Sequence, residues 1–186
     1  MKRALGLEEE DPPIMLQNIH LTSTNLDHEA FLLTLAINDL LLHNCMLGFG
    51  ASANIMPLKV MKRLNLNITN KYKNVCGFDS RIVSVEGFIK DLKVSLARNE
   101  DISLLMDVVV IDIPDVWGML LSRKWGATMG GQLQMDLSYA TIPQPNGTPF
   151  IFYREPLYLT HVVKPGPLPY YNKLETKDPT PILSSR

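Results

Sequence analysis

The sequence has little of several features that would assign it to a specialised class of protein. It has two cysteines among 186 residues, which is too few for the disulfide framework of a small secreted protein. Its net charge is -1, with 18 basic and 19 acidic side chains, so it has no strong field to attract nucleic acid or an anionic membrane. No window approaches the ~18 apolar residues of a membrane span, and the N-terminal MKRALGLEEEDPP turns acidic where a signal peptide would be apolar. We therefore expect an intracellular, soluble and cytoplasmic protein without a membrane as partner, and the composition gives no indication of nucleic-acid binding.

The sequence also offers no set of metal ligands. Cys45 and Cys76 each lie in or beside an apolar run, where a free thiol behaves as a small hydrophobic side chain. His43 and Cys45 are two positions apart and would share one face of a strand, but no second ligand pair accompanies them. We expect structural thiols and no metal site.

What is present is the composition of one globular domain with tails. Hydrophobic residues make up 46% of the chain and charged residues 20%, which suffices for a single core. Residues 1–28, with an acidic run and two adjacent prolines, indicate a loosely held N-terminal arm. Residues 144–186 keep one strand-like patch, PFIFY, and then become proline-rich, which predicts a tail or linker that could dock in an aromatic groove. The folded domain should span residues 29–143.

Short apolar runs separated by turn residues predict that this domain is all-β. Residues 30–37 and 40–47, on either side of Asn38-Asp39, are typical of a hairpin. The first run has no decisive period, so a helix stays open as an alternative there. Residues 75–96 predict a second, long hairpin, which turns at Gly77 and is interrupted at Gly87 by a bulge or a close backbone approach.

The second half of the domain continues this pattern. The β-branched run at 106–113 predicts a strand buried on both faces, and residues 119–123 predict a short core strand. Residues 124–128 suit a helical turn, after which QLQMDL and YATIP offer two alternating segments.

One short helix is expected in the first half of the domain. Pro57 suits the first turn of a helix, and Ser52 or Asn54 is near enough to cap it. Leu58, Met61 and Leu64 follow at helical spacing and should face the core.

Two motifs stand on either side of the expected long hairpin, in a recognisable order. The first has Gly50-Ala51-Ser52, then Asn54, then Met56-Pro57; the second is Leu120-Leu121-Ser122-Arg123. In this order the sequence resembles the retropepsin-like aspartic proteases, in particular those of plant gypsy-type retrotransposons. The motifs of that family are apolar-Asp-[Ser/Thr]-Gly-Ala-Ser, followed by x-Asn-x-Met-Pro, and apolar-Leu-Gly-Arg. The resemblance covers residues 30–142, most of the chain.

The resemblance implies a small closed barrel with one or two short helices, working as a homodimer. Each chain of such a dimer gives one aspartate to a shared cleft, and a flap hairpin folds over an extended peptide or polyprotein substrate. The family uses no metal or organic cofactor. The substrate-binding residues that the resemblance implies are Gly50, Ala51 and Ser52 below the substrate and Gly77, Phe78, Asp79 and Ser80 at the flap tip.

The catalytic position of this motif carries no acid. Aligned on Gly50-Ala51-Ser52, the catalytic aspartate falls at Gly48 and the usual serine or threonine at Phe49. Aspartic proteases need two carboxylates that share one proton, one acting as base and the other as acid. Glycine supplies neither, and a homodimer loses both carboxylates at once. We therefore predict a catalytically inactive, retrotransposon-derived aspartic peptidase-like domain with a degenerate motif at Gly48, Phe49 and Gly50.

Other chemistry has weaker support in the sequence. Asp39, Asp79, Asp107 and Asp112 lie in a turn, at the flap tip and beside a strand, so none is expected within hydrogen-bond reach of the cleft. Ser52 lacks the Gly-x-Ser-x-Gly elbow of a nucleophile. The Gly-Phe-Gly stretch at 48–50 lacks the third glycine and the acidic residue of a dinucleotide loop.

Two alternative functions stay open. The chain is an active endopeptidase for polyprotein processing if a partner chain supplies the carboxylates, or if the codons for Gly48 and Phe49 were misread. It is a non-enzymatic peptide-binding or dimerisation module if the cleft captures extended peptides through backbone hydrogen bonds, which require no acid or base.

Overall fold

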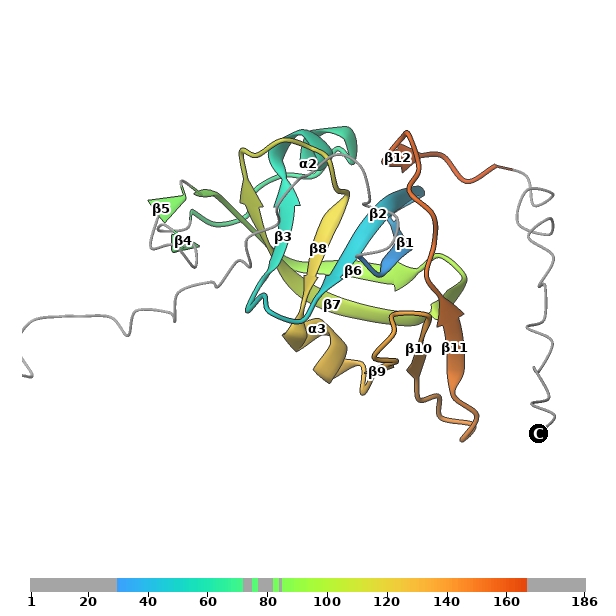
Figure 1. Cartoon of the computed structure of the whole chain (residues 1–186). Coiled ribbons are helices and arrows are strands. Elements are labelled where there is room, and N and C mark those ends of the chain that lie inside the picture. Colours follow the sequence, from blue (N-terminus) through green and yellow to red (C-terminus); the bar gives the residue numbers. More distant parts are fainter. Residues whose placement is uncertain (1–29, 72–74, 77–81, 84, 167–186) are drawn as a thin grey trace, which may run out of the picture.

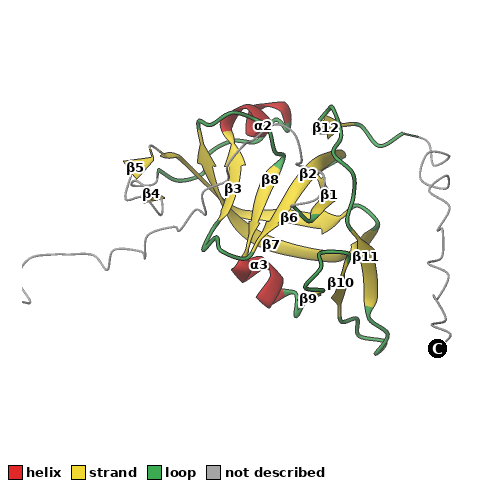
Figure 2. Ribbon diagram, viewed as in Figure 1, coloured by secondary structure: helices red, strands yellow, loops and turns green. Residues whose placement is uncertain are grey.

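The computed structural model describes residues 30–71, 75–76, 82–83 and 85–166 of the chain (Figure 1). Within this part the secondary structure is almost entirely β, with two short helices (Figure 2). The helices are α2 (Leu58–Arg63) and α3 (Arg123–Thr128). The strands are β1 (Leu32–Ile37), β2 (Leu40–Gly48), β3 (Asn54–Pro57), β4 (Val75–Cys76), β5 (Ile82–Val83), β6 (Val85–Leu96), β7 (Asn99–Ile111), β8 (Met119–Ser122), β9 (Gln132–Leu133), β10 (Tyr139–Ile142), β11 (Phe150–Tyr153) and β12 (Val162–Val163).

Six of these strands close into a barrel. The main sheet has the order β1-β6-β7-β3-β8-β2-β12, and an additional pairing of β1 with β2 joins its two sides. The ring therefore runs through β1, β6, β7, β3, β8 and β2, with β12 attached outside it. The predicted small closed all-β barrel with short helices is confirmed.

The first hairpin forms where the sequence predicts it. β1 and β2 pair antiparallel, with Ile37 opposite Leu40 at the turn. Asn38 in this turn has a φ of 53°, a left-handed conformation that asparagine tolerates better than most residues. The helical alternative for the first run is wrong.

The residues predicted to form one long hairpin belong to two different strand pairs in the structure. β4 pairs with β5, but the chain then continues into β6, which pairs along β7 instead. The predicted interruption at Gly87 is confirmed, because the β6–β7 register shifts there and Gly87 has a φ of 151°. A Cβ at Gly87 would lie 2.6 Å from the backbone oxygen of Asn70, so both the conformation and the close approach require glycine.

The stretch that is buried on both faces is the end of β7. Val108, Val109, Val110 and Ile111 are all buried, as a near-continuous β-branched run predicts. The strand ends at Ile111, and it begins earlier than predicted, at Asn99, because β6 pairs with it along most of its length.

The predicted capping of the first helix is wrong. Residues Asn54–Pro57 form β3, inserted between β7 and β8, and α2 begins only at Leu58. No side chain caps α2. Ser52 is exposed, and the side chain of Asn54 is used elsewhere. The expected helical turn at 124–128 is α3, capped by Ser122, whose Oγ accepts from the Trp125 N–H.

The first part of the segment from residue 144, predicted as a tail or linker, contains two strands of the folded domain. β11 pairs with β10, and β12 pairs with β2. Phe152 is buried and packs edge-on against Phe31, with ring centroids 5.7 Å apart. The packed chain therefore extends beyond the predicted boundary at residue 143 to Val163, because alternating aromatic residues on β11 bury one face. Residues 167–186 lie outside the described part of the chain.

Candidate functional site

The structure brings the two sequence motifs side by side. β2, which ends at Gly48, pairs in parallel with β8, which ends at Ser122. Leu47 lies opposite Leu121, and Gly48 lies opposite Ser122. Two segments far apart in the sequence thus end together at one edge of the barrel.

The turn after Gly48 is held between both motifs. The Ala51 N–H donates to the Gly48 carbonyl at 3.0 Å, which closes the turn over Phe49 and Gly50. The Ala51 carbonyl accepts from the Arg123 N–H of the second motif at 3.1 Å. Ala51 is buried, while Ser52 is exposed. The turn is therefore a fixed part of the barrel edge.

Asn54 joins two strands, β7 and β8, near the same edge of the barrel. Its Nδ2 donates to the Asp107 carbonyl on β7 at 2.9 Å, and its Oδ1 accepts from the Ser122 N–H on β8 at 2.9 Å. One buried amide thus forms hydrogen bonds to backbone groups of two different strands. The sequence marks Asn54 as part of a motif, but its partners are visible only once the strands are placed.

The space beside Gly48 is partly filled by a leucine. A Cβ at Gly48 would lie 2.5 Å from Leu120 Cδ1 and 3.5 Å from the Leu121 carbonyl oxygen. Gly48 does not have a positive φ, so its backbone conformation suits any residue. A side chain at position 48 requires only that the flexible end of Leu120 move.

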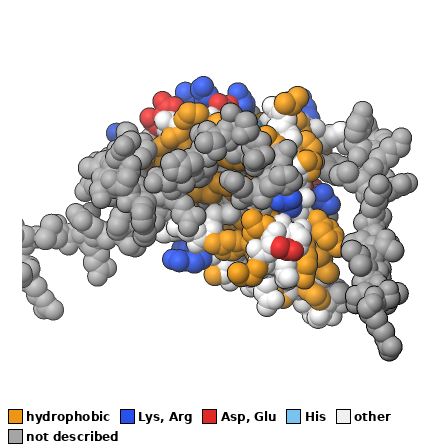
Figure 3. All heavy atoms as spheres, in the orientation of Figure 1, with side chains coloured by type: hydrophobic (Ala, Val, Ile, Leu, Met, Phe, Trp, Pro, Cys, Tyr) orange, Lys and Arg blue, Asp and Glu red, His pale blue; other side chains and the backbone are white. Residues whose placement is uncertain are grey.

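An open hollow lies beside Gly48 and Phe49, between the end of β8, α3 and the small sheet of β9, β10 and β11. Its walls are mostly apolar, with Leu121, Trp125 and Phe152 among them. Hydrophobic side chains also gather on the surface over this end of the molecule (Figure 3). The residues that line the hollow are Leu47, Gly48, Phe49, Leu121, Ser122, Trp125, Gly126, Gly131, Gln132, Leu133, Ala140, Thr141, Ile142 and Phe152.

No aspartate, glutamate or histidine is among these lining residues. The polar side chains among them are Ser122, Gln132 and Thr141, together with the indole of Trp125. Trp125 Nε1 is buried without a hydrogen-bond partner. Phe49, at 45% exposure, takes the place beside Gly48 where the motif has a hydroxyl. Within the part of the chain that the structure describes, the walls supply hydrogen-bond donors and apolar surface but no group that titrates near neutral pH.

The alternative carboxylates lie elsewhere. Asp39 sits in the β1–β2 turn, at the opposite end of β2 from Gly48. Asp107 is exposed on β7, where its Oδ1 accepts from the Asp91 N–H at 3.0 Å. Asp112 is exposed just beyond the end of β7. None of the three lines the hollow, and Asp79 lies outside the described residues.

The structure locates three of the predicted substrate-binding residues without testing their role. Gly50 and Ala51 belong to the turn closed on Gly48, Ser52 follows it, and none of the three is among the residues that line the hollow. The flap-tip residues Gly77, Phe78, Asp79 and Ser80 fall between β4 and β5, outside the part of the chain that the structure describes.

No protein-family model and no curated protein matches the chain. Among solved structures its fold is similar to the retroviral protease-like domain of Ddi1 from Leishmania major, with a TM-score of 0.46 and 16% identity, over 66% of this chain and 93% of that one. It is also similar to EIAV protease in complex with the inhibitor HBY-793, with a TM-score of 0.47 and 18% identity, over 61% of this chain and 99% of that one. These likenesses concern the fold alone.

A second polar centre, which the sequence did not predict, lies on the other side of β2. Glu155 is buried and accepts hydrogen bonds from the Thr34 hydroxyl and from Arg98 Nε, the latter at 3.1 Å. His43 Nδ1 lies 2.8 Å from Thr34 Oγ1. Because the Thr34 hydroxyl donates to Glu155, it accepts from His43, whose proton is therefore on Nδ1. Only the fold reveals this cluster, since its members are scattered along the chain.

His43 and Cys45 are both buried on β2. Burial lowers the pKa of His43, an effect that the nearby Glu155 carboxylate partly offsets. Burial raises the pKa of the Cys45 thiol well above its usual value, so the thiol is unreactive near neutral pH. Among the described residues, no three histidine, cysteine, aspartate or glutamate side chains are grouped to hold a metal ion.

Within the residues that the structure describes, no helix is long and apolar enough to cross a membrane.

Proposed function

We propose that this chain is a retropepsin-like aspartic peptidase domain of plant gypsy-type retrotransposon origin that does not cleave peptides. The observation that carries the proposal is the parallel pairing of Gly48 with Ser122. It brings the ends of both sequence motifs together at the edge of a closed six-stranded barrel. In the motif alignment, Gly48 takes the position of the catalytic acid.

The chemistry of the site supports inactivity. Hydrolysis by this mechanism needs a carboxylate within about 2.6 to 3.2 Å of the attacking water and a second one to share its proton. The hollow beside Gly48 has no carboxylate among its lining residues. A homodimer repeats the same deficit across its two-fold axis. Among the residues that the structure describes, the hollow therefore offers neither the base nor the acid.

The scaffold around the site is nevertheless well formed. The Gly48–Ala51 turn is closed by a hydrogen bond, Asn54 joins β7 to β8, and the parallel β2–β8 pair is complete. Such a domain retains what homodimerisation and binding of an extended peptide require, since both depend on backbone groups and apolar surface. We propose these as its remaining activities.

The test is a cleavage assay with a degenerate peptide library at acidic and neutral pH. The chain as it stands is compared with the double variant Gly48→Asp, Phe49→Ser. We expect turnover only from the double variant, because it restores the acid and the neighbouring hydroxyl. Specific cleavage by the unaltered chain, blocked by a transition-state analogue of aspartic proteases, would overturn the proposal.

A further inference from the structure

The chain beyond β11 returns along the outside of the barrel as a strap, defined here as residues 154–163. The strap passes from β11 to β12 beside the β1–β2 hairpin (Figure 1). At its start the Glu155 N–H donates to the Leu32 carbonyl at 2.9 Å. At its end Val162 pairs with Leu42, and the His43 N–H donates to the His161 carbonyl at 2.7 Å.

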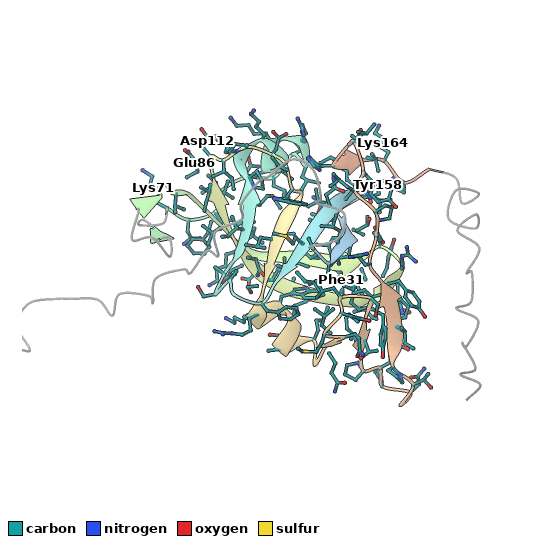
Figure 4. The ribbon with its side chains drawn as sticks, in the orientation of Figure 1. Phe31, Lys71, Glu86, Asp112, Tyr158 and Lys164 are labelled. Carbon is teal, nitrogen blue, oxygen red and sulfur yellow. The ribbon has the colours of Figure 1, made fainter. Side chains whose placement is uncertain are left out.

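Between these ends, one buried asparagine holds the strap. Asn44 Oδ1 accepts from the Tyr158 N–H at 2.8 Å, and Asn44 Nδ2 donates to the Tyr158 carbonyl at 2.8 Å. The side-chain amide thus pairs with both backbone groups of Tyr158, which Figure 4 labels beside β2. This double contact fixes which end of the amide carries the oxygen, because a flipped amide would lose both bonds.

The fixed amide in turn dictates the protonation state of His161. The second hydrogen of Asn44 Nδ2 points to His161 Nδ1, at 2.8 Å. Nδ1 must therefore be an acceptor, so the imidazole is neutral with its proton on Nε2. Nε2 lies against the Asp115 carbonyl, to which it donates. The strap is closed only around a neutral His161.

We propose that the strap is an acid-labile latch, which opens when a proton binds to His161 Nδ1. The added proton would set an N–H donor against the Asn44 Nδ2 donor, and Asn44 cannot rotate without releasing Tyr158. Opening leaves the Leu41–His43 stretch of β2 with an unpaired edge. A strand edge of this kind accepts another extended chain.

The charges around His161 do not relieve this conflict. The Asp115 carboxylate is the acidic group on the α2 side, but it is paired with Arg63 at 2.8 Å and with Lys59 at 3.8 Å. On the β2 side lies His43, itself titratable, and behind it Glu155, which is engaged by Thr34 and by Arg98.

His43 itself is not the latch. Its Nδ1–H already donates to Thr34, so further protonation falls on Nε2. That event displaces none of the hydrogen bonds described for the strap. The two histidines can therefore be separated by mutation.

The experiment follows the mobility of a nitroxide label on the full chain by electron paramagnetic resonance. The label is attached at Leu159→Cys, a fully exposed position on the strap, in a Cys76→Ser background; buried Cys45 stays in place. A second label at exposed Met135→Cys, outside the strap, serves as the matched control. Spectra are recorded at about pH 7.5 and about pH 5, on either side of the range in which histidine titrates.

We expect the Leu159 label to be less mobile at the higher pH than at the lower pH, with no change at Met135 and an unchanged far-UV circular dichroism spectrum. His161→Asn keeps an acceptor for Asn44 but cannot gain a proton, so the mobility of its Leu159 label should be the same at both pH values. Asn44→Asp sets an acceptor against both the Tyr158 carbonyl and neutral His161 Nδ1, so it should loosen the strap at the higher pH, and protonation of His161 should then tighten the strap instead of loosening it. Equal mobility at both pH values in the labelled chain without a further substitution, or acid loosening that survives in His161→Asn, would overturn the proposal.

Discussion

Gly48 and Ser122 lie opposite each other where two parallel strands end. Ser122 also caps α3 through its Oγ, and its backbone N–H is held by Asn54. The backbone around Gly48 is thus held where β2 and β8 end and α3 begins. A side chain introduced at position 48 would therefore project from a well-defined backbone.

Replacing Asn54 should destabilise the barrel edge. Asn54→Ala removes the hydrogen bonds to the part-buried Asp107 carbonyl and to the buried Ser122 N–H, and an unsatisfied buried group costs about 1–3 kcal/mol. We expect the free energy of unfolding, measured by urea denaturation, to fall by about 2–4 kcal/mol. The exposed Asn67→Ala should change it by less than about 0.5 kcal/mol. Equal effects of the two variants would refute the bridging role of Asn54.

Removing the aromatic ring of Phe152 tests whether β11 belongs to the folded domain. Phe152 is buried against Phe31, and truncation of a buried phenylalanine costs about 3–5 kcal/mol. Its neighbour Ile151 is 48% exposed and points away from the core, so Ile151→Ala should cost less than about 1 kcal/mol. Thermal denaturation of both variants measures the difference. If Phe152→Ala unfolds at the same temperature as the unaltered chain, the domain ends before β11.

The stability of the protein should rise with pH through the titration range of His43. Burial lowers the pKa of His43 in the folded state, so the unfolded chain binds the proton more tightly. Its stabilising contribution is complete above about pH 6.5, the ordinary histidine value, and is lost as the pH falls toward the lowered value. Urea denaturation at several pH values should give a slope of at most about 1.4 kcal/mol per pH unit from this group.

The control for this pH dependence is His43→Asn. Asparagine can still donate a hydrogen bond to Thr34, but it does not titrate. We expect the variant to be less stable at neutral pH, because the ring of His43 stacks on Tyr158 with centroids 4.3 Å apart, and to show a flatter slope. An unchanged slope in His43→Asn would assign the pH dependence to other groups.

Much of the barrel is predictable from local sequence. The Asn38-Asp39 turn between two apolar runs predicts the β1–β2 hairpin, and the β-branched run at 106–113 predicts a strand buried on both faces, which the structure shows as far as Ile111. Both patterns involve residues that are close together in the sequence, so they can be recognised before the three-dimensional arrangement of the strands is known. The same holds for the bulge at Gly87.

Features that depend on distant partners are not predictable in this way. An asparagine just before a helix looks like a cap, and only the placement of β7 and β8 shows that Asn54 joins them instead. The proline-rich composition after residue 143 suggests a linker, but Glu155 is buried through contacts with Thr34 and Arg98.

At the site itself, the motif alignment located Gly48 and Phe49 in the sequence. It could not show that the end of β2 lies against the end of β8, or that Leu120 fills the space beside Gly48.

The most direct test of the proposed loss of the catalytic acid is a peptide-cleavage assay on two variants that differ only at position 48. Both variants also carry Phe49→Ser and Leu120→Ala. The second change makes room for a side chain at position 48, where a Cβ would lie 2.5 Å from Leu120 Cδ1. To this background one adds either Gly48→Asp or Gly48→Asn, which have nearly the same shape but differ in acidity. We predict that both variants fold and that only Gly48→Asp hydrolyses peptides, with inhibition by a transition-state analogue. Cleavage by Gly48→Asn, or no cleavage by a folded, dimeric Gly48→Asp variant, would contradict the assignment of Gly48 as the lost catalytic position.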